Sequence, residues 1–294
     1  MSLDQVIGPL VSVTLIELML VTGLGAQLAD VIKAAHDRRL VLRASLANYV
    51  AVPAAAMFLL VLVDADPLAA TGILILAVCP GAPYAPPLTT LAGGKSAMSV
   101  GLMIIMAGSS VLMAPLLLFL LLPLITGGAD IRVDPLGMIR AILATQFLPL
   151  CCGLAVNHWR PDLAARLLGP AIAVSKVLNA ATLAAILVTQ FPELLRIRFS
   201  GFASMMILLG ISLGIGWIAG GQRDEDRKAM VLTTSIRNVG LGLVIAAGAV
   251  AGTSALTAVL AYGLVQLLGS FLLALWWRRN LSPVDVRWGG NART

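Results

Sequence analysis

The sequence predicts an all-α integral membrane protein with about nine transmembrane helices. Of its 294 residues, 59% are hydrophobic and only 12% are charged, whereas a soluble domain carries roughly 25% charged residues. The mean hydropathy of +0.97 agrees with this composition. Apolar runs of about 20 residues, the length that crosses a bilayer as a helix, recur along the whole chain. Lipid rather than water is therefore the solvent for most of the surface.

Nine apolar segments are predicted as spans, in the order 6–28, 40–63, 67–93, 96–122, 135–157, 163–190, 200–219, 226–251 and 254–278. The connections between them are short, so we expect no soluble domain. The first residues, MSLDQ, carry Asp4 where a cleavable signal peptide has a basic region. We therefore expect the first span to be retained.

The basic residues are distributed unevenly between the two ends of these spans. With nine spans and an external amino terminus, fourteen lysines and arginines fall on the inner side. Four fall on the outer side, Arg132, Arg140, Arg196 and Arg198. This bias follows the positive-inside rule and predicts a bacterial inner (plasma) membrane protein with a cytoplasmic carboxyl terminus. The net charge of +6 then faces anionic membrane lipid, and we expect no nucleic acid partner.

Two of the spans contain helix-breaking residues near their middle. The third span contains Pro80, Gly81, Pro83, Pro86 and Pro87, and proline removes a backbone donor and clashes with the preceding turn. The eighth span contains the stretch TTSIRNVGLG, in which Asn238, Gly240 and Gly242 relax the helical hydrogen bonding more gently. We predict a break in each of these helices.

Interrupted helices in matching places of two halves are the best sequence indication of a transporter's binding site, since freed backbone groups must line a protein-enclosed cavity. The third and eighth spans lie five apart and so run in opposite directions. This spacing predicts an inverted repeat of five spans whose first member is missing, with spans 1–4 in residues 1–124 and spans 5–9 in residues 125–294. The alternative is a pair of kinked helices without a ligand.

The same stretches carry a family resemblance. CPGAPYAPPLTTLAGGKSAMSV (79–100) resembles the CPGG-containing signature of the bile acid:sodium symporter superfamily, SIRNVGLGLVIAA (235–247) is similar to its second crossing, and FLPLCCGLAVNHW (147–159) to its sixth helix. The resemblance implies a core of spans 2–4 and 7–9 that moves against a panel of spans 1, 5 and 6. It also implies alternating-access transport of organic anions, in most members with sodium.

This chain departs from the family at both sodium sites that the resemblance implies. One site corresponds to Ala85, Pro86, Ser99, Met103 and Thr233, and the other to Asn48, Thr233, Thr234, Ile236 and Arg237. Thr233 replaces a glutamate shared by both sites, and Arg237 replaces a glutamine. Because arginine keeps its charge, it repels a second cation placed close to it. We therefore expect no ordinary two-sodium coupling and no other cofactor.

Three ionisable residues, Glu17, Lys176 and Arg237, fall deep within predicted spans. A charge at this depth is costly and is by default a functional candidate with a partner. In one interpretation Glu17 pairs with Lys176, which leaves Arg237 free to bind an anion. In the other, Glu17 pairs with Arg237 as a gate, and protonation of Glu17 couples transport to a proton gradient. Glu17 and Lys176 are thus candidates for coupling or gating.

The predicted function is secondary transport of a small organic anion, either sodium-independent or proton-coupled. The substrate-binding candidates are Arg237, Asn238, Thr89, Thr90, Asn48, Ser99, Thr233 and Thr234, although their hydroxyl and amide groups can equally bond neighbouring carbonyls. Gln146 and Asn179 are expected to face the crevice or to tie helices together. The alternatives are a sodium-coupled symporter that uses a residual site, and a channel or sensor that does not transport.

An enzyme is disfavoured. The two histidines, His36 and His158, fall in or beside predicted loops, so a catalytic triad has no buried imidazole. The cysteines Cys79, Cys151 and Cys152 have no zinc-site spacing, and we predict no metal site. Cys79 lies in the CPG context of the organic-anion branch, which disfavours arsenite as the substrate.

Overall fold

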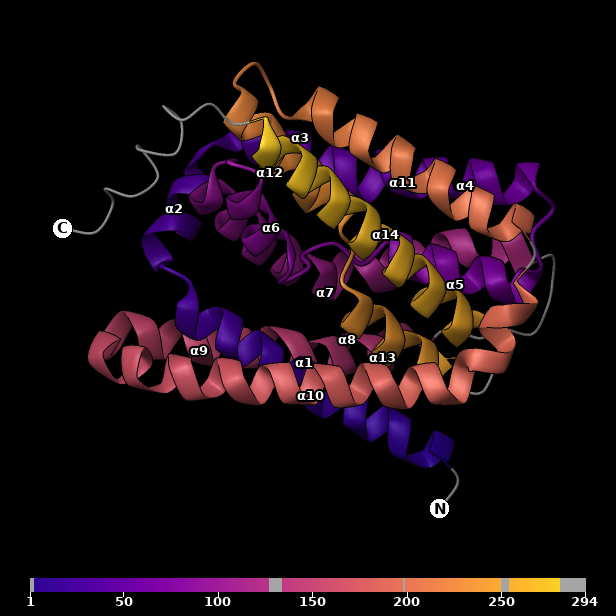
Figure 1. Cartoon of the computed structure of the whole chain (residues 1–294), viewed down its shortest axis with the longest axis horizontal. Helices are drawn as coiled ribbons and strands as arrows, with labels where there is room; N and C mark the ends of the chain where they lie inside the picture. The colour runs from indigo at the N-terminus through magenta and orange to yellow at the C-terminus, as the bar shows by residue number, and fades with distance from the viewer. Residues whose placement is uncertain (1–2, 127–133, 198, 250–253, 281–294) are drawn as a thin grey trace.

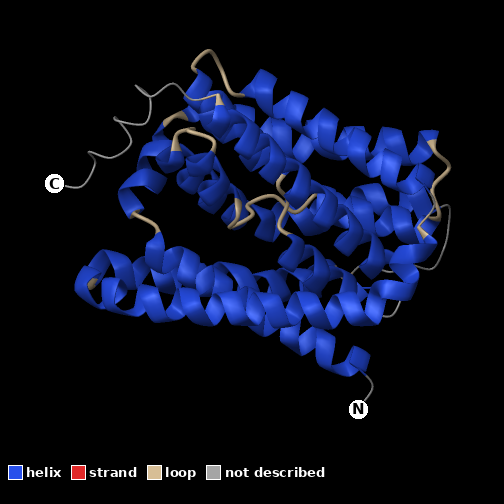
Figure 2. Ribbon diagram, in the orientation of Figure 1, coloured by secondary structure: helices blue, strands red, loops and turns tan. Residues whose placement is uncertain are grey.

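A computed structural model describes residues 3–126, 134–197, 199–249 and 254–280, and all regular structure in these ranges is helical (Figures 1 and 2). The elements are α1 (Leu3–Gly25), α2 (Leu28–His36), α3 (Arg38–Leu46), the π-helix η1 (Ala47–Ala51), α4 (Val52–Leu62), α5 (Pro67–Ala77), α6 (Ala85–Leu91), α7 (Ser96–Thr126), α8 (Pro135–Ile142), the π-helix η2 (Leu143–Phe147), α9 (Leu148–Trp159), α10 (Pro161–Arg196), α11 (Phe199–Ala219), α12 (Asp224–Ser235), α13 (Val239–Ala249) and α14 (Ser254–Arg279).

The predicted all-α membrane class is confirmed. Eight helical stretches of the described residues are long and apolar enough to cross a membrane, and each coincides with a predicted span to within a few residues. The ninth prediction, residues 67–93, is divided into α5 and α6, neither of which is long enough alone. Four basic residues counted for the charge bias, Arg132, Arg198, Arg287 and Arg293, lie outside the described residues.

Helices α1, α9 and α10 pack against one another and form a layer along one side of the molecule (Figure 1). Glycines allow the backbones of α1 and α9 to touch. A Cβ on Gly23 would lie 2.3 Å from the carbonyl oxygen of Leu150, and one on Gly153 would lie 2.2 Å from that of Leu20. We call α1, α9 and α10 the three-helix layer.

The remaining long helices form a bundle above this layer (Figure 1). Within it α14 packs on α5, α11 packs on α12 and α4, and α7 contacts α2, α5 and α6. Small residues again permit close approach, because a Cβ on Gly72 of α5 would lie 2.2 Å from the carbonyl oxygen of Ala255 of α14. Most of the buried aliphatic side chains belong to this bundle or to its contact with α1.

The first predicted break spans Val78 to Tyr84, between α5 and α6. Gly81 adopts a φ of +83°, which disfavours side chains, and a Cβ there would lie 2.5 Å from the backbone nitrogen of Ala107. The prediction was wrong about Pro86 and Pro87. They lie in the first turn of α6. Backbone N–H groups in a first turn have no intrahelical acceptor, so the N–H that proline lacks is not needed there, and proline can begin a helix rather than break one.

The second break consists of Ile236, Arg237 and Asn238, between α12 and α13. Gly240 was wrongly predicted as a breaking residue, because it lies in the first turn of α13. Its lack of a side chain serves packing instead, since a Cβ there would lie 3.0 Å from Cδ1 of Leu15 on α1. Asn238 directly precedes α13, and its Oδ1 accepts a 3.0 Å hydrogen bond from the backbone N–H of Leu241, as expected of a helix cap.

The segment between the first two predicted spans forms an additional helix, α2, which was not predicted. Gly101 of α7 allows α2 to lie against the bundle, because a Cβ there would lie 2.5 Å from Cβ of Ala34 and 2.7 Å from the carbonyl oxygen of Asp30. After α2, Asp37 accepts a hydrogen bond from the N–H of Leu40 and caps α3. The non-helical residues Ala26 and Gln27 thus join the three-helix layer to the bundle.

Candidate functional site

The two breaks meet inside the bundle, and their main chains hydrogen-bond to each other. The N–H of Asn238 donates to the carbonyl oxygen of Cys79 at 2.8 Å. The side-chain amide of Gln266 on α14 is fully buried and hydrogen-bonds both backbone polar groups of Arg237. It accepts from the backbone N–H at 3.1 Å and donates to the backbone carbonyl oxygen at 3.1 Å. The crossing therefore satisfies peptide groups that the helices have released, as an apolar interior requires.

The side chain of Arg237 is buried, with 1% of the residue exposed. Its Nη1 donates to Oδ1 of Asn48 at 3.0 Å and to the carbonyl oxygen of Asn48 at 3.4 Å. Asn48 is itself fully buried, in η1, and its Nδ2 donates to the carbonyl oxygen of Ala44. The other edge of the guanidinium, Nε and Nη2, has no hydrogen-bond partner among the described residues.

Neither predicted ion pair of Glu17 is present among the described residues. Arg237 makes no ion pair there, and its bonded partner Asn48 is neutral. Glu17 is half-buried on α1, and neither carboxylate oxygen makes a hydrogen bond of ordinary geometry, although Ser175 of α10 interacts with it. The structure therefore contains a cation and an anion that do not neutralise each other.

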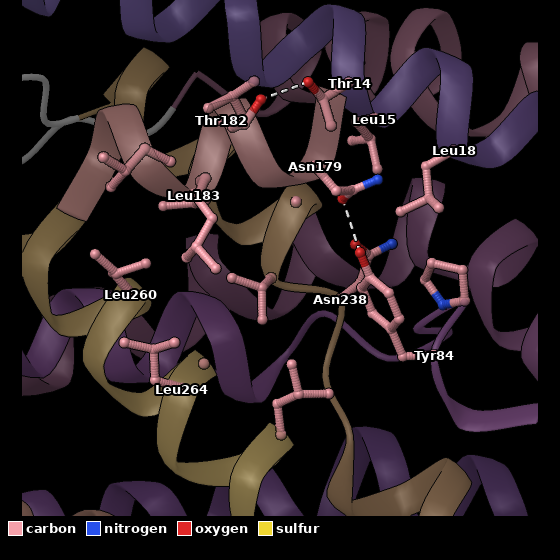
Figure 3. A pocket seen from close by; sticks show the side chains of 18 of the residues that line it. Thr14, Leu15, Leu18, Tyr84, Asn179, Thr182, Leu183, Asn238, Leu260 and Leu264 are labelled. Carbon is pink, nitrogen blue, oxygen red and sulfur yellow. Dashed lines mark hydrogen bonds between the residues drawn. The ribbon is translucent and has the colours of Figure 1, made fainter. Parts of the chain in front are cut away.

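A cavity of about 250 Å³, the central cavity, lies between the three-helix layer and the bundle at the crossing (Figure 3). Most of its wall is aliphatic, from α1, α10, α13 and α14, and both breaks contribute residues, Arg237 and Asn238 among them. Two polar pairs border it. Tyr84 donates to Oδ1 of Asn179 at 2.7 Å, and the hydroxyls of Thr14 and Thr182 are 2.7 Å apart.

A second cavity of about 500 Å³, the side cavity, shares Leu18, Pro83, Tyr84 and Asn179 with the first. It extends along α1 and α10 toward Gly25 and Leu168. Lys176 lines it with an exposed side chain that forms no ion pair in the described part of the chain. The hydrogen-bonded pair of Tyr84 and Asn179 thus stands where the two cavities meet.

The sequence matches one family of known proteins. The family model described as Sodium Bile acid symporter family matches residues 12–219, more than half of the chain. This protein belongs to that family. A relative from Bacillus subtilis (strain 168), named Uncharacterized sodium-dependent transporter YocS, is 26% identical over 210 residues, which are 70% of this chain and 64% of the relative. The match thus spans less than two thirds of that relative.

Not all of the predicted substrate-binding residues reach the central cavity in this member of the family. Arg237 and Asn238 line it, whereas Asn48 lies behind Arg237. Buried Thr89, Ser99 and Thr233 form a chain of hydroxyls, with Oγ separations of 3.1 and 3.2 Å. Exposed Thr90 bonds Ser96, and the hydroxyl of buried Thr234 has no hydrogen-bond partner in the described part of the chain. These last five residues lie outside the cavity lining.

Sequence reasoning missed some residues that the structure brings to the site. Gln266 and Tyr84 were not singled out, although a glutamine in the apolar run LAYGLVQLLGSF and a tyrosine between prolines are visible signals. Gln146 and Asn179 were expected to face the crevice or to tie helices together; Gln146 ties elements together, and Asn179 does both, since it also lines the central cavity. Gln146 accepts from Asn238 at 2.6 Å and donates to the carbonyl oxygen of Ala107 and to Ser110, and Asn179 accepts from Tyr84.

Proposed function

We propose that the protein is a secondary transporter of a small organic anion, that it works by alternating access without sodium, and that Arg237 is the anion ligand. In this proposal the three-helix layer is the panel, the bundle is the core, and the substrate occupies the central cavity between them. Membership of the family supports the transport class, and the position of the cavity at the crossing of the two breaks supports a substrate site there.

The observation that carries the proposal is the uncompensated guanidinium. Arg237 is buried, it has no acidic partner among the described residues, and its Nε–Nη2 edge is unpartnered. An unpaired buried charge is unfavourable, and removing a partner from such a charge costs about 3–5 kcal/mol. A carboxylate or sulfate bound through two parallel hydrogen bonds supplies both the missing charge and the missing acceptors.

The same guanidinium argues against sodium. It bonds Asn48, one of the residues at which the family resemblance places a sodium site, and its fixed charge repels a cation there. At the other site Ser99 and Thr233 contribute only neutral hydroxyls, which already bond Thr89 and each other. Neither site offers the carboxylate that would balance a sodium ion.

Two other charged residues are suited to roles in transport. Lys176 lies on a route by which the anion could reach the crossing, and Glu17 could couple transport to a proton gradient. Lys176 lines the side cavity and provides a positive charge in front of the pair of Tyr84 and Asn179. The carboxylate of Glu17 lacks hydrogen bonds of ordinary geometry, although its oxygens are shielded from solvent. We assign to it the binding of a proton that moves together with the substrate.

The second candidate is sodium-coupled transport through a residual site. The name of the Bacillus subtilis relative, a sodium-dependent transporter, favours it. It predicts that sodium alone raises the unfolding temperature of the purified protein and that uptake into proteoliposomes follows an imposed sodium gradient. Our proposal predicts neither effect.

The decisive experiment measures stabilisation of the purified protein by a panel of carboxylates and organosulfates in sodium-free buffer. Arg237→Gln should lose the response of the wild type, with an affinity at least about 10–100-fold weaker, because a charge-assisted hydrogen bond contributes about 1.5–3 kcal/mol. Arg237→Lys keeps the charge but lacks the paired donors, so it should recover only part of the affinity.

Arg166→Gln is the matched control, because Arg166 is an exposed residue of α10 outside the central cavity lining. It should bind the anion as the wild type does. Size-exclusion profiles must show that all variants remain folded. Unchanged affinity in folded Arg237→Gln would refute the role of Arg237, and stabilisation by sodium alone would favour the second candidate.

A further inference from the structure

A third cavity, separate from the crossing, lies where helices of the bundle end. Its volume is about 600 Å³, and it is lined by α2, α3, the start of α7, the loop between α11 and α12, and Asp226 of α12. Five basic side chains line it, Lys33, Arg39, Arg43, Lys95 and Arg223, against three acidic ones, Asp30, Asp37 and Asp226. We call this space the basic cavity.

Two of the three acidic residues are already engaged. Asp226 pairs with Lys95 at 3.4 Å, and Asp37 accepts from the N–H of Leu40. Lys33, Arg39, Arg43 and Arg223, in contrast, make no side-chain hydrogen bond or ion pair within the described ranges. The basic cavity therefore holds more free positive than negative charge.

The local backbone leaves room for these side chains. Gly221, in the loop between α11 and α12, has a φ of +83°, and a Cβ there would lie 3.4 Å from Nη1 of Arg43. The backbone N–H of Lys95 donates to the carbonyl oxygen of Glu225 and joins the start of α7 to the start of α12. Basic side chains from separate parts of the chain thus line one cavity, and the backbone segments that carry two of its walls are hydrogen-bonded to each other.

The basic cavity lies at the ends of the apolar spans, where a membrane-spanning helix meets the membrane surface. The apolar spans bordering it begin at Arg38, Ser96 and Asp224 and end at Ala219, so its lining residues lie at or just beyond span ends. Because successive spans alternate in direction, all four ends lie on one side, where α14 also ends with Arg278 and Arg279. Leu40, Ala97 and Met98 add an apolar part to the lining.

We propose that the basic cavity binds the phosphate group of an anionic ligand. Arginine pairs with phosphate oxygens through two hydrogen bonds, and Arg39 and Arg43 stand one turn apart on α3. Basic pockets between helices at a membrane surface suit the headgroups of anionic phospholipids, and the position at the span ends favours that source over a soluble phosphate compound. The proposal does not depend on which substrate the central cavity takes.

The test measures ligand binding by the full-length protein in detergent. Phosphatidylglycerol and cardiolipin are added in one arm, phosphatidylcholine in a second, and inorganic phosphate or glycerol 3-phosphate in a third. Thermal unfolding reports stabilisation, and native mass spectrometry counts retained lipid. The wild type should unfold a few degrees higher with the anionic lipids and should retain them, whereas phosphatidylcholine should have neither effect.

Arg39→Gln/Arg43→Gln should abolish both effects. The matched control is Arg160→Gln/Arg166→Gln, which removes the same charge from exposed positions at the same membrane side but outside the basic cavity. It should behave as the wild type. A response to soluble phosphate that Arg39→Gln/Arg43→Gln removes would support the site with a free ligand as its source. An equal loss in both double variants, or no response in any arm, would overturn the proposal.

Discussion

Arg237 is held by its main chain and its side chain in different ways. Gln266 fixes the peptide groups of the residue, while Asn48 fixes one end of the guanidinium. Because both partners are neutral amides, they orient the residue without neutralising its charge. The Nε–Nη2 edge is buried and has no hydrogen-bond partner among the described residues, so it is the part of the side chain left to an oxyanion in the proposed function.

Gln266 should therefore be essential to the stability of the crossing. Gln266→Leu leaves the N–H and the carbonyl group of Arg237 buried without partners, and each such group costs about 1–3 kcal/mol. We expect a clearly lower unfolding temperature in detergent. Gln190→Leu, which removes a bond to the hydroxyl of Thr257 and leaves no backbone group unpaired, should have a much smaller effect, and equal losses would contradict this role of Gln266.

For single residues, the sequence predicts the chemical character of a side chain better than it predicts the residue that the side chain contacts. The position of Arg237 among small and polar residues indicates a buried charge with a function. Its bond to Asn48 joins residues 189 positions apart, and a single sequence contains no signal for such a pairing. The pair between Glu17 and Lys176, which is absent from the described residues, illustrates the same limit, because equal depth in two spans does not fix the direction of a side chain.

Among the elements, the contact of α1 with α9 depends on two glycines. A Cβ on Gly153 would meet backbone atoms of Leu20 and Leu24 at 2.2 and 2.7 Å, and backbone atoms cannot move aside unless the helices separate. The three-helix layer therefore tolerates almost no added volume at this point.

Gly153→Ala should lower stability by about 1–3 kcal/mol, the usual cost of overpacking. Gly210→Ala is the same substitution inside another long helix, α11, but there a Cβ meets nothing within 4 Å. That variant should be neutral or more stable by about 0.5–1 kcal/mol, since alanine favours a helix over glycine. Unfolding curves of the two purified variants test this, and a stable Gly153→Ala protein would show that the two helices can separate.

Element boundaries were more predictable than the functions of individual glycines and prolines. Apolar length fixes each span because the bilayer sets it. Pro86 and Gly240 show what composition alone misses, since proline is compatible with a first turn, and a glycine near a break can serve a packing contact instead. The helix α2 escaped prediction because nine residues at a surface give only a weak pattern.

In the whole molecule, polar pairs join the three-helix layer to the bundle. Asn179 and Gln190 of α10 bind Tyr84 and Thr257, and Gln146 of η2, which continues directly into α9, binds Asn238. If the bundle moves against the layer during transport, as we propose, these bonds must break and re-form in each cycle. Each is a single neutral bond of modest net strength, about 0.5–1.5 kcal/mol, so such motion is energetically accessible.

Linking α10 to α14 should therefore stop transport. In a background without Cys151 and Cys152, Gln190→Cys/Thr257→Cys joined by a short reducible bis-thiol reagent should lose substrate uptake into proteoliposomes and recover it after reduction. Leu24→Cys/Asn157→Cys, joined within the layer between α1 and α9, should keep its uptake. Full uptake by the completely cross-linked first pair would rule out relative motion at this contact.

The wall of the central cavity has a consequence for selectivity. Its lining combines Arg237 with a largely aliphatic surface to which leucine, isoleucine and valine contribute about half of the residues. A molecule with two or three negative charges would leave at least one of them dehydrated against hydrocarbon, at a penalty of several kcal/mol. We therefore expect the central cavity to accept monovalent acids with an apolar tail. It should reject citrate-like polyacids, even though the positive charge of Arg237 attracts them more strongly at long range.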